Sequence, residues 1–180
     1  MAQPQRGFTL IELLIVISII ALMSSVVLAS VNDARTKAAN AERLQQVDEY
    51  RKALELARDS DGKYPQTNAY RCLGNPPSGI CFYNRLVVPA IVNALTPYMP
   101  SFPLAPAAKA TPQYDGLQYF TCPGPSVCGV SSLGVGPDLP MDTYGIQWVM
   151  DGSNASCGPG TAYVYNPPLP PFTFCTYVHQ

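Results

Sequence analysis

A long apolar run begins almost at the N-terminus and constrains what the rest of the chain can do. From Phe8 to Val31 there is no Lys, Arg, Asp, Pro or Gly, and the only charged side chain is Glu12. A helix needs roughly 20 predominantly apolar residues to cross a bilayer, so the run predicts one membrane-spanning helix. A secretory signal peptide has a shorter apolar core, of about 7 to 15 residues, and the run is too long for that class.

The residues at the start of the run carry a second signal. A short basic leader ends in Gly7, Phe8 follows, and Glu12 is the fifth residue after Gly7. This junction resembles the class III signal of type IV pilins and pseudopilins, in which the leader ends in Gly, the next residue is usually Phe, and Glu stands fifth after the cut. The resemblance implies that residues 1–7 are removed by a prepilin peptidase, with Gly7 and Phe8 as the processing site.

Glu12 is an unusual residue for a membrane anchor. An unpaired carboxylate deep in a bilayer costs about 2.5 to 3.5 kcal/mol on insertion scales. One explanation is that Glu12 lies only about 6 Å inside the helix start and reaches the interface, at 1.5 Å per residue. The resemblance implies another: after cleavage, the new amine of Phe8, commonly N-methylated, pairs with Glu12 of a neighbouring subunit. Phe8 and Glu12 would then be the assembly residues.

Beyond the apolar run, residues 32–61 have an amphipathic pattern. Apolar side chains recur every three or four residues, as expected for one stripe of a helix; they are Ala34, Ala38, Ala41, Leu44, Val47, Tyr50, Leu54 and Ala57. Oppositely charged residues stand four apart at 33 and 37, 48 and 52, and 51 and 55. No Pro or Gly occurs between Phe8 and Asp61. We therefore expect one continuous helix, with residues 8–31 as its transmembrane and assembly half, residues 32–61 against a head domain, and Gly62 as its stop.

Six cysteines, all after residue 70, indicate a disulfide framework in an oxidising compartment. They are Cys72, Cys81, Cys122, Cys128, Cys157 and Cys175. Fifteen connectivities are possible for six cysteines; we favour sequential pairs, 72 with 81, 122 with 128 and 157 with 175, because each closes a short loop. A metal site is the competing interpretation. It is disfavoured because there is no C-x-x-C and the one histidine, His179, is next to the C-terminus, where we expect it on the surface.

The pattern of residues 62–180 predicts a small globular head. Pro89 to Pro97 suggests a short helix, and aromatic and β-branched residues suggest strands at 116–122, 143–150, 161–165 and 172–178. In the second strand, alternate residues from Tyr144 to Met150 are apolar and would share a face. The expected fold class is α+β: a long helix packed on a small antiparallel sheet with disulfides.

The sequence offers little catalytic chemistry, and we expect neither an enzyme nor a cofactor. A nucleophile elbow, a phosphate-binding loop and an H-E-x-x-H motif are all missing. Asp138, Asp142 and Asp151 could supply oxygen ligands to Ca²⁺, but their spacing is not that of an EF-hand, and we favour solvated turn aspartates. The net charge of −1 gives no electrostatic case for nucleic acid.

Three functions of different kinds remain. The first is the structural subunit of a type IV pilus-like filament, held in the inner membrane as a precursor and then packed by homo-oligomeric assembly into an extracellular fibre. Its partners would be other copies, the prepilin peptidase and the inner-membrane assembly machinery. The second is a pseudopilin or minor pilin of a secretion or DNA-uptake system. The third, a membrane-tethered extracytoplasmic binding module or enzyme, leaves the arrangement of Gly7, Phe8 and Glu12 unexplained.

Overall fold

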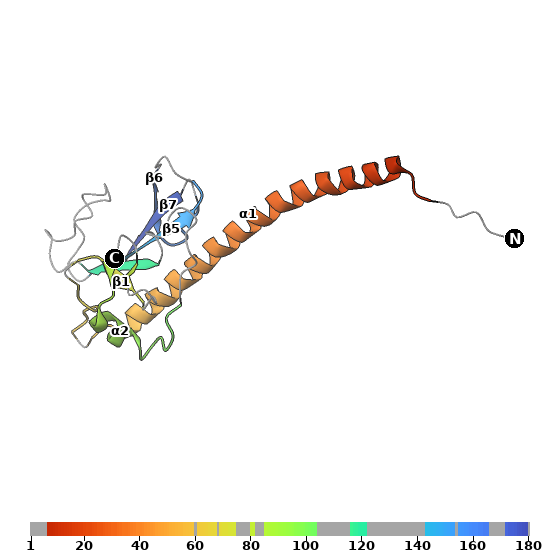
Figure 1. Cartoon of the computed structure of the whole chain (residues 1–180). Helices are drawn as coiled ribbons and strands as arrows, with labels where there is room; N and C mark the ends of the chain where they lie inside the picture. The colour runs from red at the N-terminus through yellow and green to blue at the C-terminus, as the bar shows by residue number, and fades with distance from the viewer. Residues whose placement is uncertain are drawn as a thin grey trace. The chain divides into compact units, whose positions relative to one another are not determined.

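A computed structural model describes residues 7–59, 61–67, 69–74, 80–81, 85–103, 116–121, 143–153, 155–165 and 172–179; for residues 80 and 161–165 it describes the backbone alone. The elements within these ranges are α1 (Leu10–Leu56), β1 (Arg71–Leu73), β2 (Ile80–Cys81), β3 (Arg85–Leu86), α2 (Pro89–Leu95), β4 (Leu117–Thr121), β5 (Tyr144–Asp151), β6 (Thr161–Tyr165) and β7 (Phe172–Val178). Figure 1 shows them along the chain. The fold class is α+β, as predicted.

The chain divides into two compact units, residues 1–38 and 39–180, and α1 contributes to both. The helix ends at Leu56, earlier than the expected boundary at residue 61. Asp59 explains this end, because its Oδ1 accepts hydrogen bonds from the backbone N–H groups of Asp61 and Lys63 at 3.0 and 2.7 Å. Gly62 has a φ of +77°, a left-handed conformation that glycine adopts without steric cost.

In the second unit, α1 is buried along one face, and the members of this face are Arg43, Gln46, Val47, Tyr50, Ala53 and Leu54. The predicted apolar stripe is therefore correct from Val47 onward but wrong at its start, because Ala34, Ala38 and Ala41 are exposed. Of the three expected ion pairs along the helix, the structure contains the one between Asp48 and Lys52, at 2.6 Å. Arg51 bonds to Asp48 and Tyr177 instead of pairing with Glu55.

Among the described residues, five strands form one antiparallel sheet in the order β1-β4-β5-β7-β6, and β2 and β3 pair in a second, two-stranded sheet. Strand β5 is central, and its register places Trp148 opposite Cys175 and Asp151 opposite Phe172 on β7. The predicted strands at 161–165 and 172–178 are confirmed at both ends, and the other two within a residue or two. The first three strands, each of three residues or fewer, were not predicted.

The sheet is covered on both faces. On one face, Val47, Tyr50 and Leu54 of α1 join one core cluster with the alternating residues of β5 that the sequence places together, namely Tyr144, Ile146, Trp148 and Met150. On the other face, Val149 packs in a second cluster with Cys72, Cys81 and Phe172. All eight residues of β5 are consequently buried, which a simple alternation of buried and exposed positions does not predict.

Candidate functional site

The start of α1 is organised around Thr9 and Glu12. Thr9 precedes the first helical residue, and its backbone N–H and its hydroxyl both donate to Glu12 Oε2, at 2.9 and 2.8 Å. In return, the Glu12 N–H donates to the Thr9 hydroxyl at 3.3 Å. This reciprocal pattern is a capping box, which satisfies backbone donors that a helix N-terminus leaves without partners. Glu12 therefore has a structural partner within its own chain.

The apolar half of α1 is exposed along its whole length. Phe8 is 93% exposed, and every side chain from Leu10 to Val31 is exposed in the single chain. This half lies in the helix that is long and apolar enough to cross a membrane, by length and composition. Apolar surface of this extent is unfavourable in water, so it requires either lipid or other protein around it.

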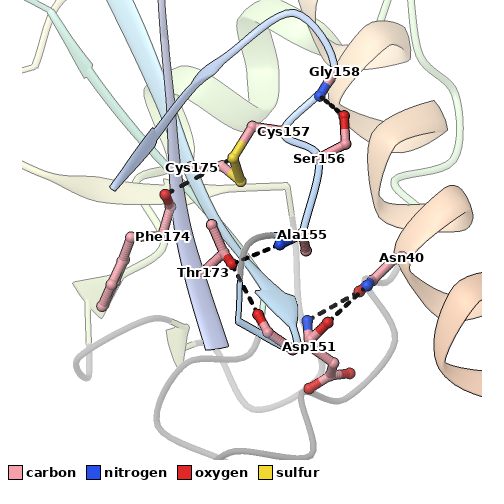
Figure 2. Close-up of a disulfide and its surroundings, with 10 residues drawn as sticks. Asn40, Asp151, Ala155, Ser156, Cys157, Gly158, Thr173, Phe174 and Cys175 are labelled. Atoms are coloured by element: carbon pink, nitrogen blue, oxygen red, sulfur yellow. Dashed lines mark hydrogen bonds between the residues drawn. A yellow bond between two sulfur atoms is a disulfide. The ribbon is translucent and has the colours of Figure 1, made fainter. Parts of the chain in front are cut away.

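Where α1 becomes buried, polar side chains connect it to the end of β5. Asn40 hydrogen-bonds to both backbone groups of Asp151, and the Arg43 guanidinium lies 3.1 Å from the Asp151 carboxylate. Arg43 and Asp151 are only 2% and 7% exposed. Figure 2 shows Asn40 facing Asp151 across this contact.

A second polar cluster surrounds Glu55, near the end of α1. Its Oε1 accepts from the Tyr144 hydroxyl at 3.1 Å, and its Oε2 from the Tyr64 hydroxyl at 2.9 Å. His179 Nδ1 lies 3.2 Å from Oε1, and the imidazole stacks on the Tyr144 ring. Burial, together with this hydrogen bond to the carboxylate, raises the pKa of Tyr64 to about 12. The cluster joins the helix, the segment after it, β5 and the chain end.

The start of the helix lies in a segment that is similar to known proteins. A family model described as the prokaryotic N-terminal methylation motif matches residues 3–28, which include Gly7, Phe8 and Glu12. Two curated proteins, both named type IV major pilin protein PilE1 of Neisseria gonorrhoeae, are 34% identical to this chain over 76 residues. Part of the chain is thus similar to type IV pilins, and its N-terminal residues match the methylation motif.

The similarity to the curated pilins is partial. Each match covers 42% of this chain, and it covers 46% and 42% of the two relatives. The chain therefore spans less than half the length of the curated relatives it matches. No solved structure matches the chain.

The cysteines of the head follow the expected sequential order where the structure describes them. Cys72 is bonded to Cys81, and Cys157 to Cys175. The first disulfide links β1 to β2, and the second links the segment after β5 to β7. The expected pair of Cys122 and Cys128 lies outside the described residues.

Two expectations for polar residues of the head need correction. Asp151 is not a solvated turn aspartate, because it is the last residue of β5 and is buried against Arg43. His179 is not a simple surface residue, since it is partly buried between Glu55 and two tyrosine rings. Asp138 and Asp142 lie outside the described residues, and within those residues no group of three metal-ligating side chains occurs.

The contact of Thr9 with Glu12 was not predicted from the sequence. The signal was present, because Thr9 and Glu12 have the T-x-x-E spacing of a capping box immediately before an apolar run. Asn40 and Arg43 carried no comparable signal, since a polar residue beside an apolar stripe is ordinarily solvent-facing.

Proposed function

We propose that this chain is a structural subunit of a type IV pilus-like extracellular filament, assembled through its N-terminal helix after cleavage between Gly7 and Phe8. In this proposal, residues 1–7 are the leader, residues 8–31 the membrane and assembly segment, residues 32–61 the segment that joins it to the head, and residues 62–180 the disulfide-stapled head. The single observation that carries the proposal is the match of residues 3–28, which include Gly7, Phe8 and Glu12, to the methylation motif.

The capping box supports a specific role for Glu12. Both bonds from Thr9 are made to Oε2, and among the described residues none is made to Oε1. The carboxylate is thus held at the helix start with one oxygen available to accept a bond from another chain. The amine of Phe8 on a neighbouring copy, freed by cleavage, is a cation of suitable size, and a charge-assisted bond of this kind is stronger than a neutral one.

The exposed apolar surface supports the same sequence of events. In the precursor, lipid would surround residues 8–31, and in the filament the same side chains of other copies would replace lipid. Helix association in such an environment depends on van der Waals packing and on bonds between helices, because lipid and protein are equally apolar. The ion pair of Glu12 with Phe8 would then fix the alignment of neighbouring helices, which apolar contacts alone leave unspecified.

A pseudopilin or minor pilin of a secretion or DNA-uptake system is the second candidate function. Both curated relatives are named major pilins, which favours a bulk filament subunit. Abundance separates the two: a major subunit would form most of the protein in sheared surface fibres, whereas a minor one would be present at a few copies.

N-terminal analysis of sheared surface material tests the cleavage. We expect the mature chain to begin at N-methylated Phe8, with Gly7→Leu accumulating as uncut precursor in the membrane. A chain that retains Met1 or Ala2 and is found in membranes alone would refute the proposal.

Replacement of Glu12 tests the assembly role separately from processing. Glu12→Ala should be cleaved normally but give far fewer filaments, because the neighbour's amine then loses its partner. Glu42→Ala is the matched control, since Glu42 is an exposed glutamate on the same helix, and it should assemble normally. Normal filament yield from Glu12→Ala would contradict the pairing.

A further inference from the structure

Asn40 bonds to Asp151 as a neighbouring strand would. Its side-chain Nδ2 donates to the Asp151 carbonyl oxygen at 2.9 Å, and its Oδ1 accepts from the Asp151 N–H at 3.0 Å. Both backbone groups of the last residue of β5 are thereby satisfied by one side chain of α1. Asparagine is suited to this contact because its amide presents a donor and an acceptor side by side, as a peptide group does.

Arg43, one helical turn further along, completes the contact. Its Nη1 donates to Asn40 Oδ1 at 2.7 Å and to Asp151 Oδ2 at 3.1 Å. The side chains of Arg43 and Asp151 are only 3% and 6% exposed, so their ion pair compensates two charges that are largely removed from water. We call Asn40, Arg43 and Asp151 the helix clamp.

The β5 side of the clamp is itself held in place. Beyond Asp151, the Thr173 hydroxyl donates to the Gly152 carbonyl at 2.8 Å and accepts from the Ala155 N–H at 3.0 Å. The Cys157–Cys175 disulfide then fastens the same segment to β7. Figure 2 shows these contacts lying side by side with the bonds from Asn40. Asn40 and Arg43 therefore bind a fixed backbone and not a loose turn.

The clamp stands at a boundary along α1. The second compact unit begins at Ala39, and Arg43 is the first buried residue of the helix. Fully buried apolar packing begins at Val47, and Leu44 is partly buried against the same core, so the polar bonds of the clamp are the first attachments of the helix to the head. Without them, about two turns of helix would lose a large part of their attachment to the head.

We propose that Asn40 and Arg43 are positioning residues for assembly: by fastening the helix to the end of β5, they fix how much of α1 remains available for packing against other copies of this chain. This inference rests on the proposed filament function. Identical copies in a helical filament must all make the same contacts. A helix that detaches from the head over residues 40–46 would allow heads of different copies to take different positions.

Hydrogen exchange of the full mature chain in detergent micelles, followed by mass spectrometry, tests the clamp. Asn40→Ala removes the bonds to the Asp151 backbone and the acceptor for Arg43. We expect amides of residues 41–47 to exchange about tenfold faster, from the typical worth of such bonds, while those of residues 50–56 and of β5 change little. Asn32→Ala, an exposed asparagine on the same helix, is the control and should leave all of these rates unchanged.

Each outcome decides the inference. Unchanged exchange at 41–47 would overturn the clamp, and an equal increase throughout 50–56 and β5 would show a general loss of stability in place of a local boundary. If exchange rises locally, Asn40→Ala should also lower the yield of sheared filaments, and a normal yield would overturn the assembly role. If the unaltered chain forms no filaments, the proposed function fails, but the exchange result still decides whether the clamp exists.

Discussion

The Tyr64 hydroxyl donates a hydrogen bond to Glu55 Oε2 at 2.9 Å and so ties the segment after α1 back to the last turn of the helix. On the other carboxylate oxygen, the Tyr144 hydroxyl donates at 3.1 Å. Tyr144 is fully buried and Tyr64 nearly so. One glutamate near the end of the helix therefore accepts bonds from two buried phenols that come from separate parts of the head.

Loss of this carboxylate should destabilise the head. Glu55→Ala leaves two buried hydroxyl groups without their acceptor, and we expect the free energy of unfolding to fall by about 1 to 3 kcal/mol. Urea unfolding, followed by fluorescence of the single tryptophan, Trp148, measures it. Asp33→Ala, at an exposed position of the same helix, should cost well under 1 kcal/mol, as is usual for surface positions, and an equal loss in both variants would count against the cluster.

The same cluster predicts a loss of stability at high pH. Burial, followed by the bond to Glu55, raises the pKa of Tyr64 from 10.0 to about 12. A pKa that is higher in the folded chain than in the unfolded one means that the unfolded chain releases the proton first. The associated stability is therefore complete below about pH 10 and is lost between about pH 10 and 12.

Tyr64→Phe provides the comparison for this pH dependence. Because the variant has no phenol at this position, its unfolding free energy should fall less steeply between pH 10 and 12 than that of the unaltered chain. Some slope should remain, because burial also raises the pKa of Tyr50, Tyr119 and Tyr144. Identical slopes in the two proteins would contradict the assignment to Tyr64.

A methyl group at residue 145 should not be tolerated. Gly145 on β5 is opposite Phe120 on β4, and a Cβ there would overlap the Phe120 ring. Overpacking of this kind typically costs about 1 to 3 kcal/mol, and we expect Gly145→Ala to lower the unfolding free energy by that amount. In Phe120→Leu, where the ring is gone, the same glycine substitution should cost less; a double-mutant cycle measures the difference.

Thr9 should matter through its hydroxyl. Thr9→Val keeps the shape of the side chain and the backbone bond to Glu12 but removes both bonds of the hydroxyl, and losing an N-cap costs about 1 kcal/mol. Amides of the first helical turn should then exchange roughly fivefold faster in micelles. Thr9→Ser, which retains the hydroxyl, should behave like the unaltered chain, and equal rates in the two variants would contradict the capping box.

The sequence was most informative where one local pattern determined the structure. The apolar run and the absence of Pro and Gly predict α1 nearly to its end, and β-branched and aromatic residues predict β6 and β7. The helix end was misplaced because Asp59 closes the turn through its side chain, a local bond that Gly62 alone does not indicate. The short strand β1 was missed because three residues cannot display an alternating pattern.

The polar contacts of the head could not be predicted, because they join residues far apart in the sequence. Arg43 and Asp151 are ordinary surface types when considered singly, and in the folded chain they form a buried ion pair in which each compensates the other's charge. Ala34 and Ala38 continue the apolar stripe by spacing, yet spacing does not indicate where the head ends. The head ends along the helix where Asn40 lies opposite the end of β5, and this position depends on the topology of the whole sheet.

The separation between helix and sheet partners also orders the events of biosynthesis. Asn40 and Asp151 are 111 residues apart, and Arg51 and Tyr177 are 126 apart. As the chain is made from its N-terminus, α1 is complete long before β5 and β7 exist, so its buried face has no sheet to cover it until translation is nearly finished. Until then the apolar face of α1 is exposed, and folding intermediates with exposed apolar surface are prone to aggregate. Insertion of the N-terminal half of α1 into a membrane would keep such incompletely folded chains apart until the head has folded.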